Sequence, residues 1–452
     1  YDNPGFIDNI GTGTKNINKE EVTGGRLALR WGISDRAEFN LLYLNQTQRI
    51  GGGQADGFQA PTSTYTPVLS GAPTDLSPPD LDNPTFRSNI DPFQELDFEA
   101  INVKLDINFE SFDLSIMAAT KQQEKRFEWD ASLFIGVYDD VTTTFKSDLS
   151  EFDTNTFEAR LVSTGDGPIE WIAGVWYEKE EGDRPDSSVI RTPRTDLIVF
   201  GVPMVDGDLF FDRDIFDDSE ELALYGEVGY RFTDKAKFTV GYRRANLKLD
   251  SGVLRADGVF DAFVAAGSAA IGDDESTEED VDVYKFHFEY TFNEDMLGYA
   301  VASSGYRAGG FNRGGIRTPS SKYESDSLWN YEVGVRSSWL DNRLIVNTVA
   351  YYIDWTDIQL RAFALDALAQ RIQNVGKASS LGLETEIRYQ ATESLQLSVN
   401  YGYIDATLDS DVETNGTILA EDGDRLPGSN KHNVSVYADW QMPITSELDF
   451  QA

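Results

Sequence analysis

The sequence contains no cysteine and only two histidines, His287 and His432. The two histidines fall in separate segments and no cysteine supports them, so a transition-metal cluster is not expected. Basic residues are scarce as well, with 38 Lys and Arg against 77 Asp and Glu and a formal net charge of −39. Proteins gain affinity for nucleic acid by neutralising its phosphates, so this acidic chain is not expected to bind nucleic acid.

Long apolar runs are also missing. No stretch approaches 18 apolar residues, which excludes a transmembrane helix. The glycine-rich stretch VASSGYRAGGFNRGG (301–315) is no phosphate-binding loop either. Gly305 and Gly310 have the spacing of such a loop, but Phe311 and Asn312 stand where Lys and Ser or Thr are required.

What the sequence does contain is alternation. In VDVYKFHFEYTF (281–292) the even positions from Tyr284 to Phe292 are all aromatic, and the odd positions from Lys285 to Thr291 are all polar. LGLETEIRY (381–389) shows the same period, and so do several other segments. A period of two predicts β-strands with one apolar face and one polar face. The faces of segment 345–355 cannot be assigned in this way.

The links between these segments are short and long in turn. Short links rich in Gly, Asp, Asn, Pro and Ser fall near 32–35, 109–112, 164–168, 232–236, 293–295, 340–342, 391–394 and 442–446. Long links fall near 49–92, 128–150, 181–218, 250–277, 311–323, 359–369 and 409–429. Strict alternation predicts an all-β fold of about sixteen strands in one antiparallel meander. Long loops at one end only are typical of a transmembrane β-barrel, with short periplasmic turns and long extracellular loops.

Aromatic residues cluster close to the short links, as the aromatic girdle of a membrane barrel requires. They are Trp31, Phe109, Phe112, Trp171, Tyr230, Phe232, Phe238, Phe292, Trp339, Tyr389 and Trp440. The opposite, polar face of the strands carries charges that are tolerable only beside water or a polar partner, so we expect it to face inward. This inward set is Arg26, Arg30, Lys104, Asp106, Glu158, Arg160, Glu227, Arg231, Lys285, Glu289, Arg336, Glu384, Glu386 and Arg388.

Four segments carry a family resemblance: GGRLALRW (24–31), GYRAGGFN (305–312), LWNYEVGVRSSWLDNRLIVNTVAYYIDWTDIQ (328–359) and NVGKASSLGLETEI (374–387). They resemble the barrel of a TonB-dependent outer-membrane receptor. The resemblance implies a barrel of about 22 strands, of which residues 1–452 supply about sixteen as one truncated barrel domain. It places the plug domain and TonB box before Tyr1 and the last strands after Ala452.

The same resemblance implies a function and partners. The protein would import a scarce nutrient, such as an iron–siderophore complex, a cobamide or an oligosaccharide, with energy supplied through TonB. Its partners would be outer-membrane lipid, the nutrient, and the TonB complex by way of the plug. The alternatives are a passive porin-like channel without a plug, and a soluble all-β adhesin or enzyme. Glu384 and Glu386 share a face as paired catalytic carboxylates do, but such a pair is more often a solvated lumen wall, and we expect no enzyme.

Two sets of residues are candidate binding sites. Tyr306, Arg307, Phe311 and Asn312 stand at the upper end of a strand, where they face a ligand or simply belong to a glycine-rich bend. The long links are acidic, with ten acids against four bases in 181–218 and six against one in 409–429. This charge indicates either a solvated surface or a mouth that concentrates cations.

The second set is a calcium loop. DVETNGTILAED (411–422) places Asp411, Glu413 and Asn415 at alternate positions, Gly416 sixth and Asp422 twelfth. This approaches the EF-hand pattern, although Glu413 is longer and Asp422 shorter than usual. The alternative is an ordinary turn at Asn415–Gly416. No other cofactor is expected.

Overall fold

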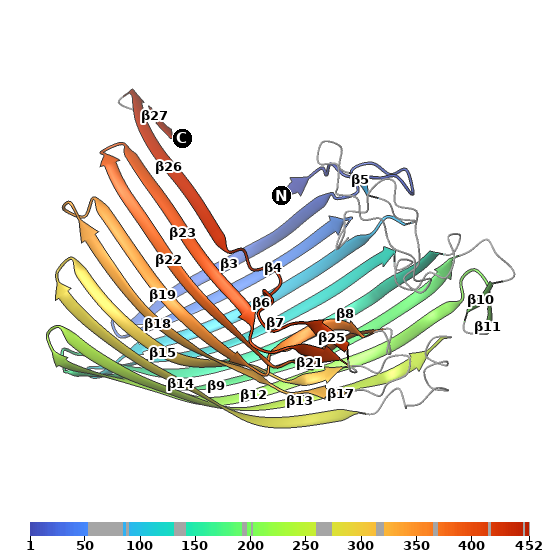
Figure 1. The fold of residues 1–452 in the computed structure, drawn as a ribbon, viewed down its shortest axis with the longest axis horizontal. Helices are drawn as coiled ribbons and strands as arrows, with labels where there is room; N and C mark the ends of the chain where they lie inside the picture. Colours follow the sequence, from blue (N-terminus) through green and yellow to red (C-terminus); the bar gives the residue numbers. More distant parts are fainter. Residues whose placement is uncertain are drawn as a thin grey trace.

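The computed structural model describes residues 1–52, 85–86, 90–130, 142–191, 197–199, 202–258, 274–312, 321–364, 369–414, 417–445 and 448–451. These residues form one large, strongly curved antiparallel sheet (Figure 1). No helix in them is long and apolar enough to cross a membrane. The predicted all-β architecture is confirmed.

Within the described residues the main sheet has 17 strands, one of which, β1 (Asp2–Asn3), has only 2 residues. The other sixteen match the predicted strands and pair antiparallel along the chain. They are β3 (Glu20–Ser34), β4 (Ala37–Gly51), β6 (Phe93–Asn108), β7 (Phe112–Asp130), β8 (Thr142–Ser163), β9 (Ile169–Arg191), β12 (Leu209–Thr233), β13 (Ala236–Asp257), β14 (Glu275–Asn293), β15 (Met296–Arg307), β18 (Asp326–Trp339), β19 (Leu344–Thr356), β22 (Lys377–Thr392), β23 (Leu395–Leu408), β26 (His432–Thr445) and β27 (Leu448–Gln451).

The short links connect these strands where the sequence predicts them. Each joins an antiparallel pair, such as β12 to β13 at Thr233–Ala236 and β14 to β15 at Asn293–Met296. The long link predicted at 181–218 is much shorter in the structure. β9 continues to Arg191 and β12 begins at Leu209, so most of the expected loop 181–218 is strand. These strand ends still pair in register, from Asp183 with Phe216 to Val189 with Leu209, which explains why the strands extend so far.

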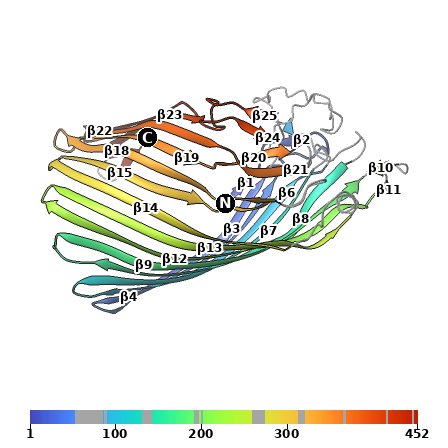
Figure 2. The same cartoon turned by 60° about the horizontal axis from the view of Figure 1, so that its bottom comes forward.

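Small paired segments stand within the long links. They are the hairpins β10 (Leu197–Val199) with β11 (Val202–Met204), β16 (Gly310–Asn312) with β17 (Ser321–Tyr323), β20 (Gln359–Ala364) with β21 (Ala369–Asn374) and β24 (Val412–Thr414) with β25 (Thr417–Ala420), and the parallel pair β2 (Asp8–Asn9) with β5 (Thr85–Phe86). Figure 2 shows β20, β21, β24 and β25 gathered at one end of the sheet. A small apolar cluster lies there, made of Ile358, Val375, Ala378, Leu408 and Val412.

The two faces of the sheet differ in chemistry. In β14 the residues from Tyr284 to Phe292 at even positions are exposed, and the odd positions between them are half-buried. Side chains splay apart on the convex face of a curved sheet and crowd together on the concave face, so the aromatic row is convex. The register continues this apolar face through Ala300, Val333 and Ala350 to Leu383. The convex face is the one suited to lipid.

Most of the predicted girdle lies on this convex face, exposed and close to the short turns. Exposed members are Trp31, Phe109, Tyr230, Phe232, Phe292, Trp339 and Trp440. Pairs of them touch, as Tyr230 and Phe232 do with ring centroids 4.9 Å apart. The belt therefore marks the expected boundary of a bilayer at the short-turn end.

Candidate functional site

The concave face carries the charged residues predicted to face inward, and several of them pair across strands. Lys285 of β14 reaches Glu227 of β12 with Nζ 2.9 Å from Oε1, although β13 lies between them. Gly241 is the β13 residue in register with both, and its missing side chain leaves room for the contact. Nζ of Lys237 lies 2.5 Å from Oε2 of Glu170 in the same way. A wall of this kind suits water or a polar occupant.

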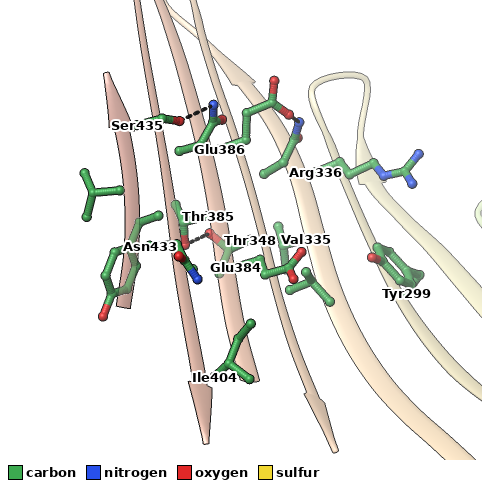
Figure 3. Close-up of a pocket in the computed structure, with 16 residues that line it drawn as sticks. Tyr299, Val335, Arg336, Thr348, Glu384, Thr385, Glu386, Ile404, Asn433 and Ser435 are labelled. Carbon is green, nitrogen blue, oxygen red and sulfur yellow. Dashed lines mark hydrogen bonds between the residues drawn. The ribbon is translucent and has the colours of Figure 1, made fainter. Parts of the chain in front are cut away.

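A hollow of about 710 Å³ lies on the concave side of β15, β18, β19, β22, β23 and β26. Figure 3 shows the polar side chains that line it, among them Arg336, Glu384, Asn433 and Ser435. Asn400 donates from Nδ2 to Oγ of Ser435 at 3.2 Å. The hollow is open and rich in groups that form hydrogen bonds, so it can hold a polar surface but encloses no small molecule.

Glu384 and Glu386, the pair considered for catalysis, both line this hollow. Glu386 accepts hydrogen bonds from Arg388 at 3.1 Å and from Asn347 at 3.2 Å. Its position is that of a residue in a charged lumen wall.

The four predicted ligand residues stand at the opposite, long-loop end. Tyr306 and Arg307 close β15, whereas Phe311 and Asn312 belong to β16. The Arg307 guanidinium binds the carboxylate of Asp326 and donates to the backbone oxygen of Gln359 at 3.0 Å. Arg307 therefore joins neighbouring segments, as Asn312 also does, and the ligand role of all four residues stays a prediction.

Asn312 is the more deeply placed of those two, with 7% of its surface exposed. Its amide bonds both backbone groups of Ile372, which lies 60 residues further along the chain. The sequence gives a weak signal for this role, because an Asn after a glycine pair indicates a turn and not a contact. No sequence pattern points to the residues that complete the same set of contacts, which are Asp326, Gln359 and Asn374.

In the predicted calcium loop, Asp411, Glu413 and Asp422 are described, whereas Asn415 and Gly416 lie outside the described residues. Val412–Thr414 pairs with Thr417–Ala420, so the segment is a hairpin. Oδ1 of Asp411 accepts a hydrogen bond from the backbone N of Asp422 at 2.8 Å. Across the described part of the chain, no group of three His, Cys, Asp or Glu is placed to hold a metal ion. Calcium binding stays a prediction.

Several solved structures share this fold, among them three receptors. The ferric yersiniabactin uptake receptor FyuA from Yersinia pestis superimposes with a TM-score of 0.74 at 16% identity, covering 100% of this chain and 61% of that one. The siderophore receptor PiuA from Acinetobacter baumannii gives 0.67 at 14% identity, covering 94% and 63%. The ferric-catecholate import receptor Fiu from E. coli gives 0.64 at 15% identity, covering 97% and 64%. This chain therefore spans less than two thirds of their length.

A family model described as TonB dependent receptor-like, beta-barrel, matches residues 21–450. The match takes in every one of the sixteen predicted strands, apart from the first residue of β3 and the last of β27. The apolar convex face, the aromatic girdle and the polar concave face agree with it. The chain belongs to the family of TonB-dependent receptors, as a β-barrel of the cell outer membrane.

Proposed function

We propose that this chain forms the barrel of a receptor that imports an iron–siderophore complex across the outer membrane, with energy supplied through TonB. Family membership supports the receptor class. Three structural relatives are described as siderophore receptors or ferric-siderophore importers, which favours this ligand class over a cobamide or an oligosaccharide.

The observation that carries the proposal is the polar concave wall. Its charges form cross-strand pairs such as Lys285 with Glu227 and Lys237 with Glu170, and it borders a hollow of about 710 Å³. Lipid cannot satisfy these groups, but a hydrated path or a folded plug can. Such a wall can contact a polar plug when the path is closed and water when it is open, which fits gated import. In this proposal the plug is the polar body, and TonB acts on the receptor through the plug.

The long-loop end is where the ligand would first bind. Tyr306 and Phe311 are both partly exposed there. Aromatic rings offer area for a siderophore at a small cost in side-chain entropy. Because Arg307 and Asn312 hold neighbouring loops, we assign direct ligand contact to Tyr306 and Phe311 and a positioning role to the other two.

The test is iron uptake by the full-length protein in a strain that lacks its own siderophore receptors. Cells supplied with labelled ferric siderophores of hydroxamate, catecholate and mixed classes should accumulate iron from at least one class, and loss of TonB should abolish this uptake. Uptake that persists without TonB, together with open-channel conductance in planar bilayers, would instead establish the porin-like alternative. Tyr306→Ala and Phe311→Ala should weaken ligand binding, whereas Asn400→Ala in the wall should not.

A further inference from the structure

Asn312 acts as a β-bridge made by a side chain. Its Nδ2 donates to the backbone oxygen of Ile372 at 2.6 Å, and its Oδ1 accepts from the backbone N of Ile372 at 2.7 Å. A strand residue exchanges the same two bonds with its partner in an antiparallel ladder. The hairpin β16–β17, which contains Asn312, is thereby joined to the hairpin β20–β21, which contains Ile372.

Asn374 and Gln359 of the second hairpin likewise bind backbone groups through their side-chain amides. Asn374 accepts from the backbone N of Glu324 at 2.7 Å and donates to the Glu324 oxygen at 2.8 Å. Gln359 donates from Nε2 to the backbone oxygens of Ala308 at 2.8 Å and Glu324 at 3.0 Å. Both residues lie at the base of β20–β21, and both hold the backbone that flanks β16–β17.

A buried carboxylate completes the junction. Asp326 is 2% exposed, binds the Arg307 guanidinium, and accepts from the backbone N of Gln359 at 3.0 Å. Arg307 also lies over the ring of Trp355, with 5.2 Å from its guanidinium carbon to the ring centroid. Since a buried carboxylate is costly without partners, β20 cannot leave β15 and β18, the two strands that flank the first hairpin, without depriving Asp326 of the Gln359 N–H.

The second hairpin rests in turn on a third. Ile358, directly before β20, packs in the apolar cluster with Leu408 and Val412, and Ala420 of β25 packs against the same cluster. The cluster therefore joins β20–β21 to the segment that carries β24–β25. Figure 2 shows β20, β21, β24 and β25 gathered at the long-loop end of the sheet.

We infer that the hairpins β16–β17, β20–β21 and β24–β25 form one cooperative unit and not three independent loops. A buried hydrogen-bonding group such as the Asn312 amide is costly to leave without a partner, which opposes the opening of either hairpin alone. If one hairpin opens alone, the groups that it shares with the next hairpin lose their partners. The backbone amides of all three hairpins should therefore lose their protection from hydrogen exchange together. A ligand that orders one hairpin then orders the other two, which couples separate loops without any contact between ligand and all three. The inference does not depend on which ligand is imported.

Hydrogen exchange of the full-length protein in detergent tests this coupling. Asn312→Ala should raise amide exchange roughly tenfold, and by similar factors, in both β16–β17 and β20–β21, because two hydrogen bonds are lost. Ile358→Ala is the sharper variant, since Ile358 packs in the cluster shared with the third segment. It should raise exchange in all three hairpins by a common factor.

Asn400→Ala is the matched control, because Asn400 bonds Ser435 in the barrel wall, away from the hairpins. It should leave hairpin exchange unchanged, and amides of β14 should stay protected in every variant, which shows that the barrel is intact. Exchange that rises only in the hairpin that carries the substitution would overturn the inference. So would an Ile358→Ala variant whose β16–β17 amides exchange as slowly as those of the parent protein.

Discussion

The ring of Tyr299 lies across Gly334 on the neighbouring strand, and its hydroxyl donates to Oε1 of Glu332 at 2.6 Å. The same arrangement recurs where Tyr351 lies across Gly382. In each case a large lumen-facing ring occupies the space that a glycine leaves free. At these places in the concave wall, a tyrosine on one strand therefore packs over a glycine in register on the adjacent strand.

Gly334→Ala should destabilise the barrel by about 1–3 kcal/mol, because the added methyl would overlap the Tyr299 ring and force it out of place. The measurement is urea unfolding of the full-length protein in lipid vesicles. Gly25→Ala is the control, since nothing lies within 4 Å of a side chain added at Gly25. Equal losses in both variants would show that the cost comes from the strand backbone and not from the ring.

Phe286→Arg should cost about 2–4 kcal/mol of barrel stability, since Phe286 stands on the convex face among the lipid-facing aromatics. Glu384→Gln, on the concave face, should cost little because it removes no lipid contact. Folding in vesicles, followed by the mobility shift between folded and heat-denatured protein, measures both. A harmless Phe286→Arg would mean that no bilayer surrounds this face.

The strands were predictable because their chemistry alternates with the geometry of a two-faced sheet. Val281–Phe292 has rings on one side and polar groups on the other, and the structure keeps that division. β19 could not be assigned because its inward face is itself partly apolar: Val349 and Tyr351 face the lumen there, next to Gly334 and Gly382. With apolar residues on both faces, the period of two disappears.

The loop-end hairpins were not predictable for a different reason. What holds them is a set of side-chain amides bound to backbone groups far along the chain, such as Asn312 to Ile372. A polar residue in a turn-rich stretch looks the same in the sequence whether its amide meets water or a backbone 60 residues away. The sequence also predicts β9 and β12 to be shorter than they are. Acidic residues disfavour strands locally, but here the acidic ends of the two strands pair with each other.

Acidification should release the segment before β3. Burial raises the pKa of Asp91, but hydrogen bonds from Thr12, Thr14 and Asn9 lower it by more, so the pKa lies below the ordinary value of an aspartate. A carboxyl with a lowered folded-state pKa stabilises the fold fully above its unfolded pKa, and this contribution is lost as the pH falls through the folded pKa. Residues 9–14 should therefore become more sensitive to proteolysis below about pH 4.

An acid-active protease reports this release, and Asp91→Asn is the control. The variant lacks the titrating group, so its cleavage within residues 9–14 should be fast at neutral pH and change little on acidification. If the parent protein is cleaved at the same rate at pH 3 and pH 7, Asp91 does not hold the segment in the way that its hydrogen bonds indicate.

The calcium prediction for 411–422 can be decided by titration of the full-length protein. Asp411 and Glu413 alternate with buried Val412, so both side chains leave the same side of β24. Asp411 already binds the backbone N of Asp422 at 2.8 Å, which brings the first and last residues of the pattern together. A loop without flanking helices should bind weakly, with a Kd of roughly 10⁻⁴–10⁻³ M. Millimolar Ca²⁺ should then protect 409–429 from proteolysis, Mg²⁺ should not, and Asp411→Ala should lose the protection. Cleavage that is identical with and without Ca²⁺ would leave an ordinary hairpin, in which the Asp411 carboxylate serves only to close the turn.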